Sequence, residues 1–173
     1  MKNQILGLAF IGLISTTYAC TNPTKTVNEE TASTETEQVA VNPKFTDAKV
    51  NEVYQHYIHL KTALVNNDNK EAEMGAKMLQ KAMSDAEIDT KSIDAVVAVN
   101  NVETKRAKFN DLSNELASVF KKSKLESGIV YKQYCPMAND GKGGYWLASE
   151  SKIKNPYYGE KMLGCGSIEE EIK

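Results

Sequence analysis

Two cysteines and two methionines near the C-terminus of the chain carry the sulfur atoms best suited to chemistry. Cys135 and Met137 are two positions apart, so in an extended segment their side chains would point to one side. Met162 and Cys165 are three positions apart, which suits one face of a helical turn or a tight loop. Thiolate and thioether sulfur are soft donors that favour monovalent copper over calcium or magnesium. The four residues therefore predict a soft-metal site.

The same two cysteines also suit a disulfide. In that reading Cys135 bonds to Cys165, and Met137 and Met162 pack as ordinary hydrophobic residues. Disulfides persist in exported proteins, and a bond closing this loop would stabilise the fold by about 3 kcal/mol. The spacing does not decide between a metal and a disulfide, because the fold of the intervening segment determines whether the two sulfurs meet.

The first twenty residues predict export. A positively charged start at Lys2 precedes the apolar run from Ile5 to Ile14 and a short polar stretch that ends at Ala19, which is the order of a secretory signal over residues 1–19. Cys20 directly after Ala19 resembles the lipobox of bacterial lipoproteins. We expect Cys20 to be lipidated and to anchor the protein to a bacterial membrane, facing the periplasm or the cell surface. The alternative is ordinary cleavage and a soluble product.

Composition divides the rest of the chain into a tether and one domain. Residues 20–42 are rich in threonine, glutamate and asparagine and contain no aromatic residue, so they predict a disordered tether. Residues 43–173 are long enough for a single domain with one core. The formal net charge of −2 offers no basic field for phosphates, so nucleic acid is not an expected partner.

Three segments show helical spacing of apolar residues. The first covers residues 45–66, with Thr46 as the expected N-cap and Phe45 and Val50 packed on either side of that cap. The second begins at the Asp68–Glu71 capping box, runs to about residue 86 and has small residues on its inner face, which predicts a tight antiparallel helix pair. The third starts near residue 102. The apolar run 93–99 is too short to assign to a helix or a strand.

After residue 128 the pattern changes to short β-prone runs around a glycine-rich loop at 139–144. The predicted fold is mainly α: an up-and-down helical bundle with a small irregular or β-hairpin C-terminal cap. Trp146, Tyr157 and Tyr158 of this cap would cover the open end of the bundle. The functional alternative is that they contact a bound metal ion or a partner protein.

Other residues with metal-binding side chains favour ordinary roles. His56 and His59 lie beside the apolar stripe of the first helix, where solvated surface histidines are the usual reading. Methionine in a helix more often fills uneven packing than binds metal, and of Met74, Met78 and Met83 only Met83 is expected on the inner face. The chain lacks a Cys-x-x-Cys pair and a phosphate-binding glycine loop, so we expect a non-enzymatic protein.

The overall pattern over roughly residues 47–172 resembles the domain of unknown function 3347. The resemblance rests in the helical part on Tyr54, Tyr57, Leu60, Lys61, Ala63, Leu64, Arg106, Phe109, Leu112 and Ser113. In the C-terminal part it rests on Tyr131, the run Tyr134 to Ala138, the run Gly141 to Leu147, the run Asn155 to Gly159, Met162, Cys165 and Gly166.

That family occurs in exported bacterial lipoproteins and fused to periplasmic adaptor subunits of heavy-metal efflux pumps. The resemblance implies a helical domain, a link to copper or silver handling, and a heavy-metal efflux component as a partner. The Cys-Pro-Met run also looks like the start of metal-binding segments in such adaptors, where histidine commonly follows; here the next residue is Ala138. Two readings remain: a soft-metal-binding accessory lipoprotein, or a disulfide-stapled interaction module without metal.

Overall fold

The computed structural model describes residues 42–173, which fall in one compact unit. The predicted signal peptide, the lipidation of Cys20 and nearly all of the predicted tether lie outside the described residues. Within residues 42–173, none of the helices is long and apolar enough to cross a bilayer.

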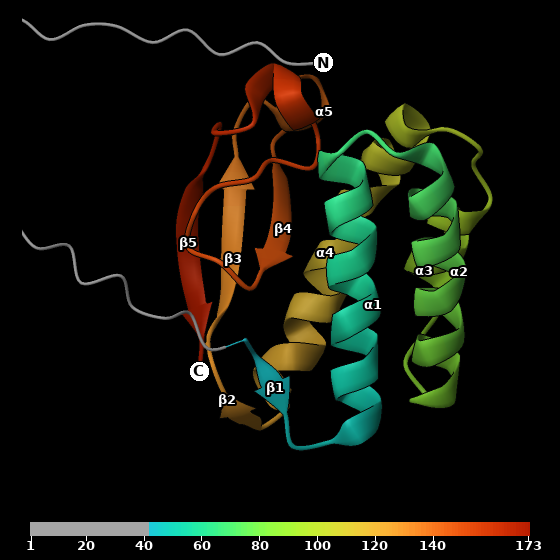
Figure 1. Ribbon diagram of the computed structural model, residues 1–173, viewed down its shortest axis with the longest axis vertical. Coiled ribbons are helices and arrows are strands. Elements are labelled where there is room, and N and C mark those ends of the chain that lie inside the picture. The colour runs from blue at the N-terminus through green and yellow to red at the C-terminus, as the bar shows by residue number, and fades with distance from the viewer. Residues whose placement is uncertain (1–41) are drawn as a thin grey trace, which may run out of the picture. The chain divides into compact units, whose positions relative to one another are not determined.

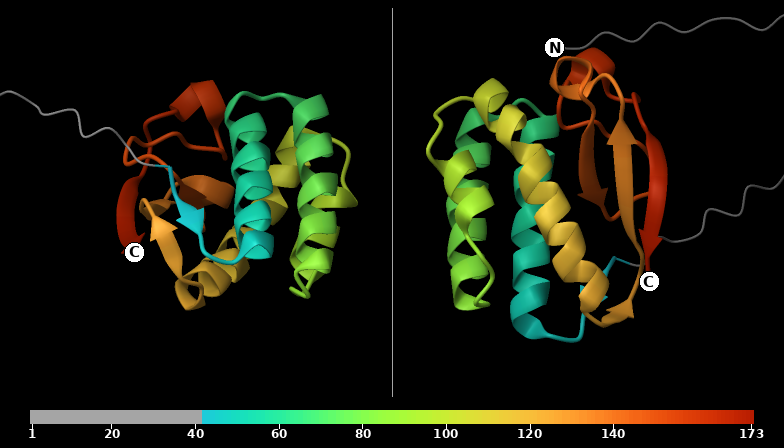
Figure 2. Two further views of the ribbon diagram at one scale, coloured as in Figure 1. Left: turned by 60° about the horizontal axis from the view of Figure 1, so that its bottom comes forward. Right: turned by 180° about the vertical axis from the view of Figure 1, so that it is seen from behind.

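The helical part consists of four helices. They are α1 (Ala48–Val65), α2 (Asn69–Asp85), the short α3 (Lys91–Val97) and α4 (Val102–Lys122). α1 and α4 lie between a small β-sheet and the pair α2–α3, as Figures 1 and 2 show. The predicted mainly-α bundle with a small β cap is confirmed, and the undecided run 93–99 falls largely in α3.

α2 follows its sequence signals closely. Asp68 is the N-cap, and its side chain accepts a hydrogen bond from the Glu71 amide across 3.0 Å, which satisfies one of the amides that a helix start leaves free. The predicted small inner face is buried against α1. A Cβ atom placed on Gly75 would lie 3.2 Å from both Cα and N of Leu60, so glycine is what allows the two backbones to approach this closely.

The start of α1 differs from the prediction. Asp47, and not Thr46, is the N-cap, and its side chain accepts hydrogen bonds from the amides of Lys49 and Val50. The reason is a long-range pairing: residues Lys44–Phe45 form β1, which pairs with β2 (Leu125–Ser127), and the Thr46 amide donates to Lys124 O. This pairing keeps Thr46 outside the helix.

The cap contains a three-stranded antiparallel sheet in the order β4–β3–β5. Its strands are β3 (Val130–Cys135), β4 (Gly144–Ala148) and β5 (Ser167–Ile172). The predicted hairpin is formed by β3 and β4. β5 follows the 3₁₀ turn η1 (Gly159–Met162) and pairs with β3, and this third strand was not predicted from the sequence. Val130 pairs with Ile172 at one end of the sheet, and Cys135 pairs with Gly144 at the other.

The turn between β3 and β4 is left-handed, which explains its composition. In α5 (Ala138–Gly141), Asn139 and Asp140 have φ angles of 53° and 57°, and Gly141 follows at 81°. Asparagine, aspartate and glycine are the residue types that adopt this conformation with least strain. Gly143 has a φ angle of 83°, which favours glycine, and a Cβ atom there would lie 2.1 Å from the Tyr134 hydroxyl and would displace that ring.

Side chains of the helices fix the outer edge of β4. The amide of Tyr145 donates to Asn110 Oδ1 of α4 at 3.0 Å, and the amide of Leu147 donates to the Tyr57 hydroxyl of α1 at 3.0 Å. Unpaired backbone groups on a buried strand edge would be costly, and here two helices supply the partners. The sheet is therefore held in one position relative to the bundle.

Candidate functional site

Cys135 and Cys165 come together at the end of the sheet nearest α5. Cys135 is the last residue of β3 and is fully buried. Cys165 lies between η1 and β5 and is partly exposed. Its amide donates a hydrogen bond to Met162 O at 3.0 Å. Their Sγ atoms are 2.7 Å apart, longer than a disulfide bond of about 2.05 Å, and both side chains are thiols in this structure. The sequence left open whether the two sulfurs meet, and the fold answers that they do.

The close contact changes the acidity of the pair. A hydrogen bond with Cys135, together with burial, raises the pKa of the Cys165 thiol to about 11. Cys165 is thus protonated at neutral pH when the site is empty and reduced. A metal ion that binds thiolates must displace protons from this pair, which makes its affinity dependent on pH.

The backbone around Cys165 is held by Asn155, a buried residue that the sequence analysis named in the family resemblance but gave no role. Asn155 Nδ2 donates to Cys165 O at 2.8 Å, and Asn155 Oδ1 accepts from the amides of Tyr157 and Tyr158 at 2.8 and 3.3 Å. This is an Asx turn, for which the Asn155-Pro156 dipeptide was the available sequence signal. Asn155 therefore couples the aromatic segment to the cysteine loop.

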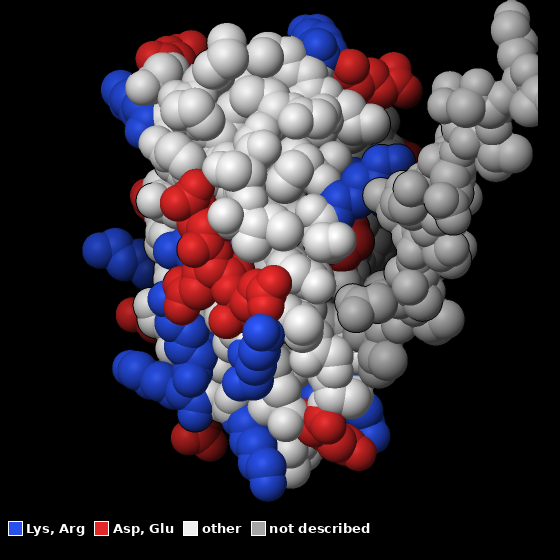
Figure 3. Space-filling model, turned by 90° about the vertical axis from the view of Figure 1, so that its left-hand side faces the viewer, with Lys and Arg blue, Asp and Glu red and all other residues white. Residues whose placement is uncertain are grey.

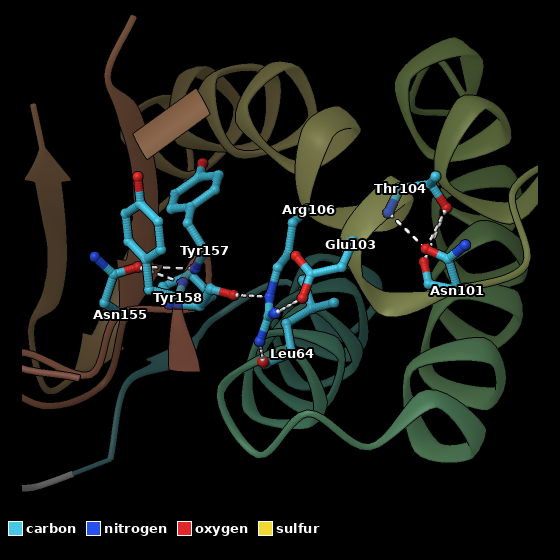
Figure 4. A network of polar contacts seen from close by, with 9 residues as sticks. Leu64, Asn101, Glu103, Thr104, Arg106, Asn155, Tyr157 and Tyr158 are labelled. Atoms are coloured by element: carbon cyan, nitrogen blue, oxygen red, sulfur yellow. Dashed lines mark hydrogen bonds and ion pairs between the residues drawn. The ribbon is translucent and has the colours of Figure 1, made fainter. Parts of the chain in front are cut away.

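Arg106 of α4 holds the same aromatic segment against the helices, as Figure 4 shows. Its Nε donates to Pro156 O at 2.7 Å, one terminal nitrogen donates to Leu64 O at 2.6 Å, and the other bonds Glu103 at 2.8 Å. Two of the three acceptors are carbonyl oxygens from segments far apart in sequence. Only the planar, five-donor guanidinium group serves all three at once.

Gly159 shows how tightly this segment fits. Its φ angle is 55°, and a Cβ atom there would lie 2.7 Å from Val65 O and 3.0 Å from an Arg106 nitrogen. Gly166 is similar, because a Cβ atom would lie 2.7 Å from the Trp146 ring and 2.8 Å from Tyr134 O. Both glycines of the motif are thus required by close approach on either side of Cys165.

The two predicted methionine ligands are close to the cysteines in the sequence and differ in exposure. The Met137 side chain is 51% exposed, and its carbonyl oxygen accepts a hydrogen bond from the Tyr158 hydroxyl. Met162 is partly buried and shares the tight turn that contains Cys165. In residues 42–173, no three side chains of histidine, cysteine, aspartate or glutamate gather around one metal position. That set of side chains does not include methionine, so it does not bear on a site with thioether ligands.

The aromatic residues of the cap are mostly interior. Trp146 and Tyr157 are buried, so neither offers a surface to a partner, and the expectation of a partner contact through these two residues is corrected. Their alternative role, covering the end of the bundle, fits the packing: the Tyr157 hydroxyl donates to Tyr145 O, and the Tyr157 ring lies edge-on to Trp146 with centroids 6.1 Å apart. Tyr158 is the one of the three that reaches the surface.

The histidines and the helical methionines lie on other parts of the bundle. His59 contacts Glu71 of α2 at 2.9 Å, and His56 lies 3.7 Å from Glu52. Both histidine side chains are partly exposed on the surface of α1 and lie next to carboxylates. Met83 is buried in the core, as predicted, while Met74 and Met78 are exposed on α2.

A comparison with known protein families matches part of the chain. Residues 53–128 match the family described as "Protein of unknown function (DUF3347)", which agrees with the resemblance predicted from the sequence. No curated protein and no solved structure shows significant similarity to the chain.

The matched range extends from α1 to Gly128, so the two cysteines and the rest of the sulfur motif lie outside it. It includes Arg106, the residue through which the helices hold the Asn155–Gly159 segment. Residues 53–128 of this chain are therefore similar to the DUF3347 family of proteins of unknown function.

Proposed function

We propose that the C-terminal cap binds a monovalent soft metal ion, copper or silver, and that the protein is a non-enzymatic accessory to metal homeostasis or efflux. The observation that carries this proposal is the 2.7 Å contact between the sulfurs of Cys135 and Cys165, two thiols brought together from β3 and the η1–β5 loop. Met137 and Met162, in the neighbouring turns, are the proposed thioether ligands.

The chemistry of the donors supports a soft cation. Thiolates and thioethers bind Cu(I) strongly and bind calcium or magnesium poorly. The partial exposure of Cys165 gives an ion access from solvent, while the burial of Cys135 protects the bound ion. The two sulfurs need to separate for an ion to lie between them, and there is open space beside Gly164, next to Cys165.

The test is an anaerobic titration of the reduced protein with Cu(I) against a competing chelator. We expect wild type to take up one Cu(I), and we expect Cys135→Ser to lose at least about tenfold in affinity and Met162→Leu to lose less, because thiolate is the stronger donor. Met78→Leu, an exposed methionine on α2, is the matched control and should bind like wild type. If Cys135→Ser and Met162→Leu both bind like wild type, the assigned site is wrong.

The same 2.7 Å contact favours a second candidate, a disulfide-stapled interaction module. A small approach of the two sulfurs would form the bond, and the staple would stabilise the fold by about 3 kcal/mol. Mass spectrometry of the protein isolated without reductant separates the two candidates: a staple lowers the mass by two hydrogen atoms. A protein that remains oxidised in millimolar reductant and takes up no Cu(I) would favour the module over the metal site.

Export and anchoring belong to this proposal as well. The order of residues 1–20 supports a signal peptide followed by lipidation of Cys20, with the protein facing the periplasm or cell surface and a heavy-metal efflux component as its partner. Expression of wild type and Cys20→Ala in a bacterial host tests the anchor. Wild type should sediment with membranes and Cys20→Ala should not; equal distribution of the two would contradict lipid anchoring.

A further inference from the structure

The two cysteines of the cap differ sharply in their access to solvent. Cys135 is fully buried, and its strand partner Gly144 lies under the Tyr157 ring, 2.6 Å from where a Cβ atom would be. Cys165 is partly exposed. Its neighbour Leu163 is 39% exposed, and Gly164 borders open space. A molecule arriving from solvent therefore reaches the Cys165 sulfur and not the Cys135 sulfur.

The surface on this side of the cap is largely uncharged. Figure 3 looks onto the side of the molecule that carries β5: charged side chains gather in its lower half, and the part toward α5 is mostly free of them. Three of the exposed large apolar residues of the described chain belong to the cap, namely Met137, Leu163 and Ile168. The exposed apolar residues and low charge of the cap suit a partner that presents an apolar surface around its own thiol.

We propose that the cysteine pair is a reversible redox gate, and that an external dithiol protein opens it by attacking Cys165. This inference rests on the proposed metal site. If that site is correct, the dithiol form binds Cu(I) and the disulfide form does not, so the gate controls metal binding. The partner is defined by its chemistry, as a thiol–disulfide exchange protein with an apolar surface around its own thiol.

The exchange proceeds through a mixed disulfide. A thiolate of the reduced partner attacks Cys165 Sγ, the bond between Cys165 and Cys135 breaks, and Cys135 leaves as a thiolate that takes a proton from water. The second thiolate of the partner then attacks the partner's own sulfur in the mixed disulfide and releases Cys165, which is protonated in turn. The protein gains two electrons and two protons, and the partner becomes a disulfide. The reverse reaction with an oxidised partner closes the gate.

Access determines which sulfur is attacked. Displacement at a disulfide needs the incoming sulfur on the far side of the atom it attacks, roughly in line with the S–S bond. Cys165 belongs to the exposed loop 163–165, where an incoming sulfur has room to approach, whereas Cys135 is fully buried. The fold thus makes Cys165 the entry sulfur and Cys135 the leaving sulfur.

The direction of attack can be measured on the wild-type protein. The chain is oxidised with glutathione disulfide, exposed briefly to 2-mercaptoethanol, and alkylated with iodoacetamide, and the modified cysteines are located by peptide mass analysis. We expect the mercaptoethanol adduct on Cys165 and the alkyl group on Cys135, with a preference of about tenfold or more. An adduct mainly on Cys135, equal adducts on both, or no disulfide after oxidation overturns the proposal.

Single-cysteine variants provide a second, independent readout. Cys135→Ser leaves Cys165 as the thiol of the described domain, and Cys165→Ser leaves Cys135. In a variant set that also carries Cys20→Ala, the Cys165 thiol should react with an aromatic disulfide reagent about tenfold faster than the Cys135 thiol, and the rates should become equal in denaturant. Equal rates in the folded proteins count against the gate. Cu(I) uptake by the reduced wild type is measured separately, so a failure of the metal site and a failure of the gate give different results.

Discussion

The side chain of Asn155 donates a hydrogen bond from Nδ2 to the carbonyl oxygen of Cys165 across 2.8 Å. Oδ1 of the same buried side chain accepts hydrogen bonds from the amides of Tyr157 and Tyr158. One residue thereby fixes the loop that carries the exposed thiol relative to the aromatic segment packed on α4.

Asn155→Asp removes the donor to Cys165 and leaves the acceptor for the two amides. We expect a loss of about 1–3 kcal/mol in the free energy of unfolding, because a buried carboxylate would then face the Cys165 carbonyl oxygen. Copper affinity of the reduced protein should fall as well, since the loop is less well positioned. Urea unfolding and chelator competition measure the two effects. Asn100→Asp, at an exposed position, is the control; equal behaviour of the two variants would contradict the positioning role.

Arg106→Lys tests the three-way contact between the helices and the Asn155–Gly159 segment. Lysine has one nitrogen in place of the three of the guanidinium group, so its donors start from a single point and cannot serve Pro156 O, Leu64 O and Glu103 together. We expect a loss of about 3 kcal/mol in urea unfolding, because buried carbonyl oxygens lose a charged donor. Glu103→Gln removes only the exposed partner and should change stability by less than about 1 kcal/mol. A near-neutral Arg106→Lys would refute this account of the cap.

Gly75→Leu tests the close approach of α1 and α2. The added side chain would begin with a Cβ atom 3.2 Å from the Leu60 backbone, so the helices must separate, and we expect destabilisation of about 1–3 kcal/mol. Leucine is a good helix former, so helix propensity does not account for such a loss. Met78→Leu on the exposed side of α2 should be close to neutral. Thermal unfolding of both variants decides; an unchanged Gly75→Leu would mean that the interface tolerates the side chain.

The ion pair of Lys61 and Glu150 predicts a loss of stability in acid. Lys61 is 2% exposed and lies 2.6 Å from Glu150, joining α1 to the segment after β4. Burial alone would raise the pKa of Glu150, but the hydrogen bond and charge of Lys61 outweigh it and hold this pKa below its ordinary value of 4.5. The unfolded chain therefore binds this proton more readily, so the stabilisation is complete above pH 4.5 and is lost as the pH falls through the folded-state pKa.

Glu150→Gln should accordingly cost about 2–3 kcal/mol near neutral pH, because it leaves a buried ammonium group without its partner charge. The difference between wild type and the variant should shrink below about pH 4.5 as Glu150 becomes protonated. Urea unfolding of wild type and Glu150→Gln across pH 3–7 measures this difference in the free energy of unfolding. Glu126→Gln, which removes an exposed pair with Lys44, should change stability by less than about 1 kcal/mol. A difference that is independent of pH would exclude the ion pair as its source.

The parts of the fold predicted correctly from the sequence are those governed by local physics. The capping box at Asp68 and Glu71 and the small face of α2 follow from hydrogen bonds and spacing within one helix. The N-cap of α1 was misplaced by one residue because two good caps, Thr46 and Asp47, are adjacent, and the choice between them depends on pairing with residue 124, far along the chain.

For the candidate site, too, local features could be predicted from the sequence and long-range contacts could not. The candidate residues could be chosen from the sequence because Cys135, Met137, Met162 and Cys165 all lie within residues 135–165. The meeting of Cys135 and Cys165 depends on β5 pairing with β3, and the β5 sequence of Ser167–Ile172 contains three consecutive glutamates in place of an alternating pattern. The buried positions of Trp146 and Tyr157 likewise depend on how the Asn155–Gly159 segment folds back, which no local pattern specifies.

Copper-edge X-ray absorption on the reduced, Cu(I)-loaded protein tests the central claim most directly, because it identifies the atoms bound to the metal. We predict a first shell made of sulfur alone, and loss of that signal in the variant with both Cys135→Ser and Cys165→Ser. A first shell of nitrogen or oxygen, or an unchanged spectrum in the double variant, would contradict the assignment of a soft-metal site to this cap.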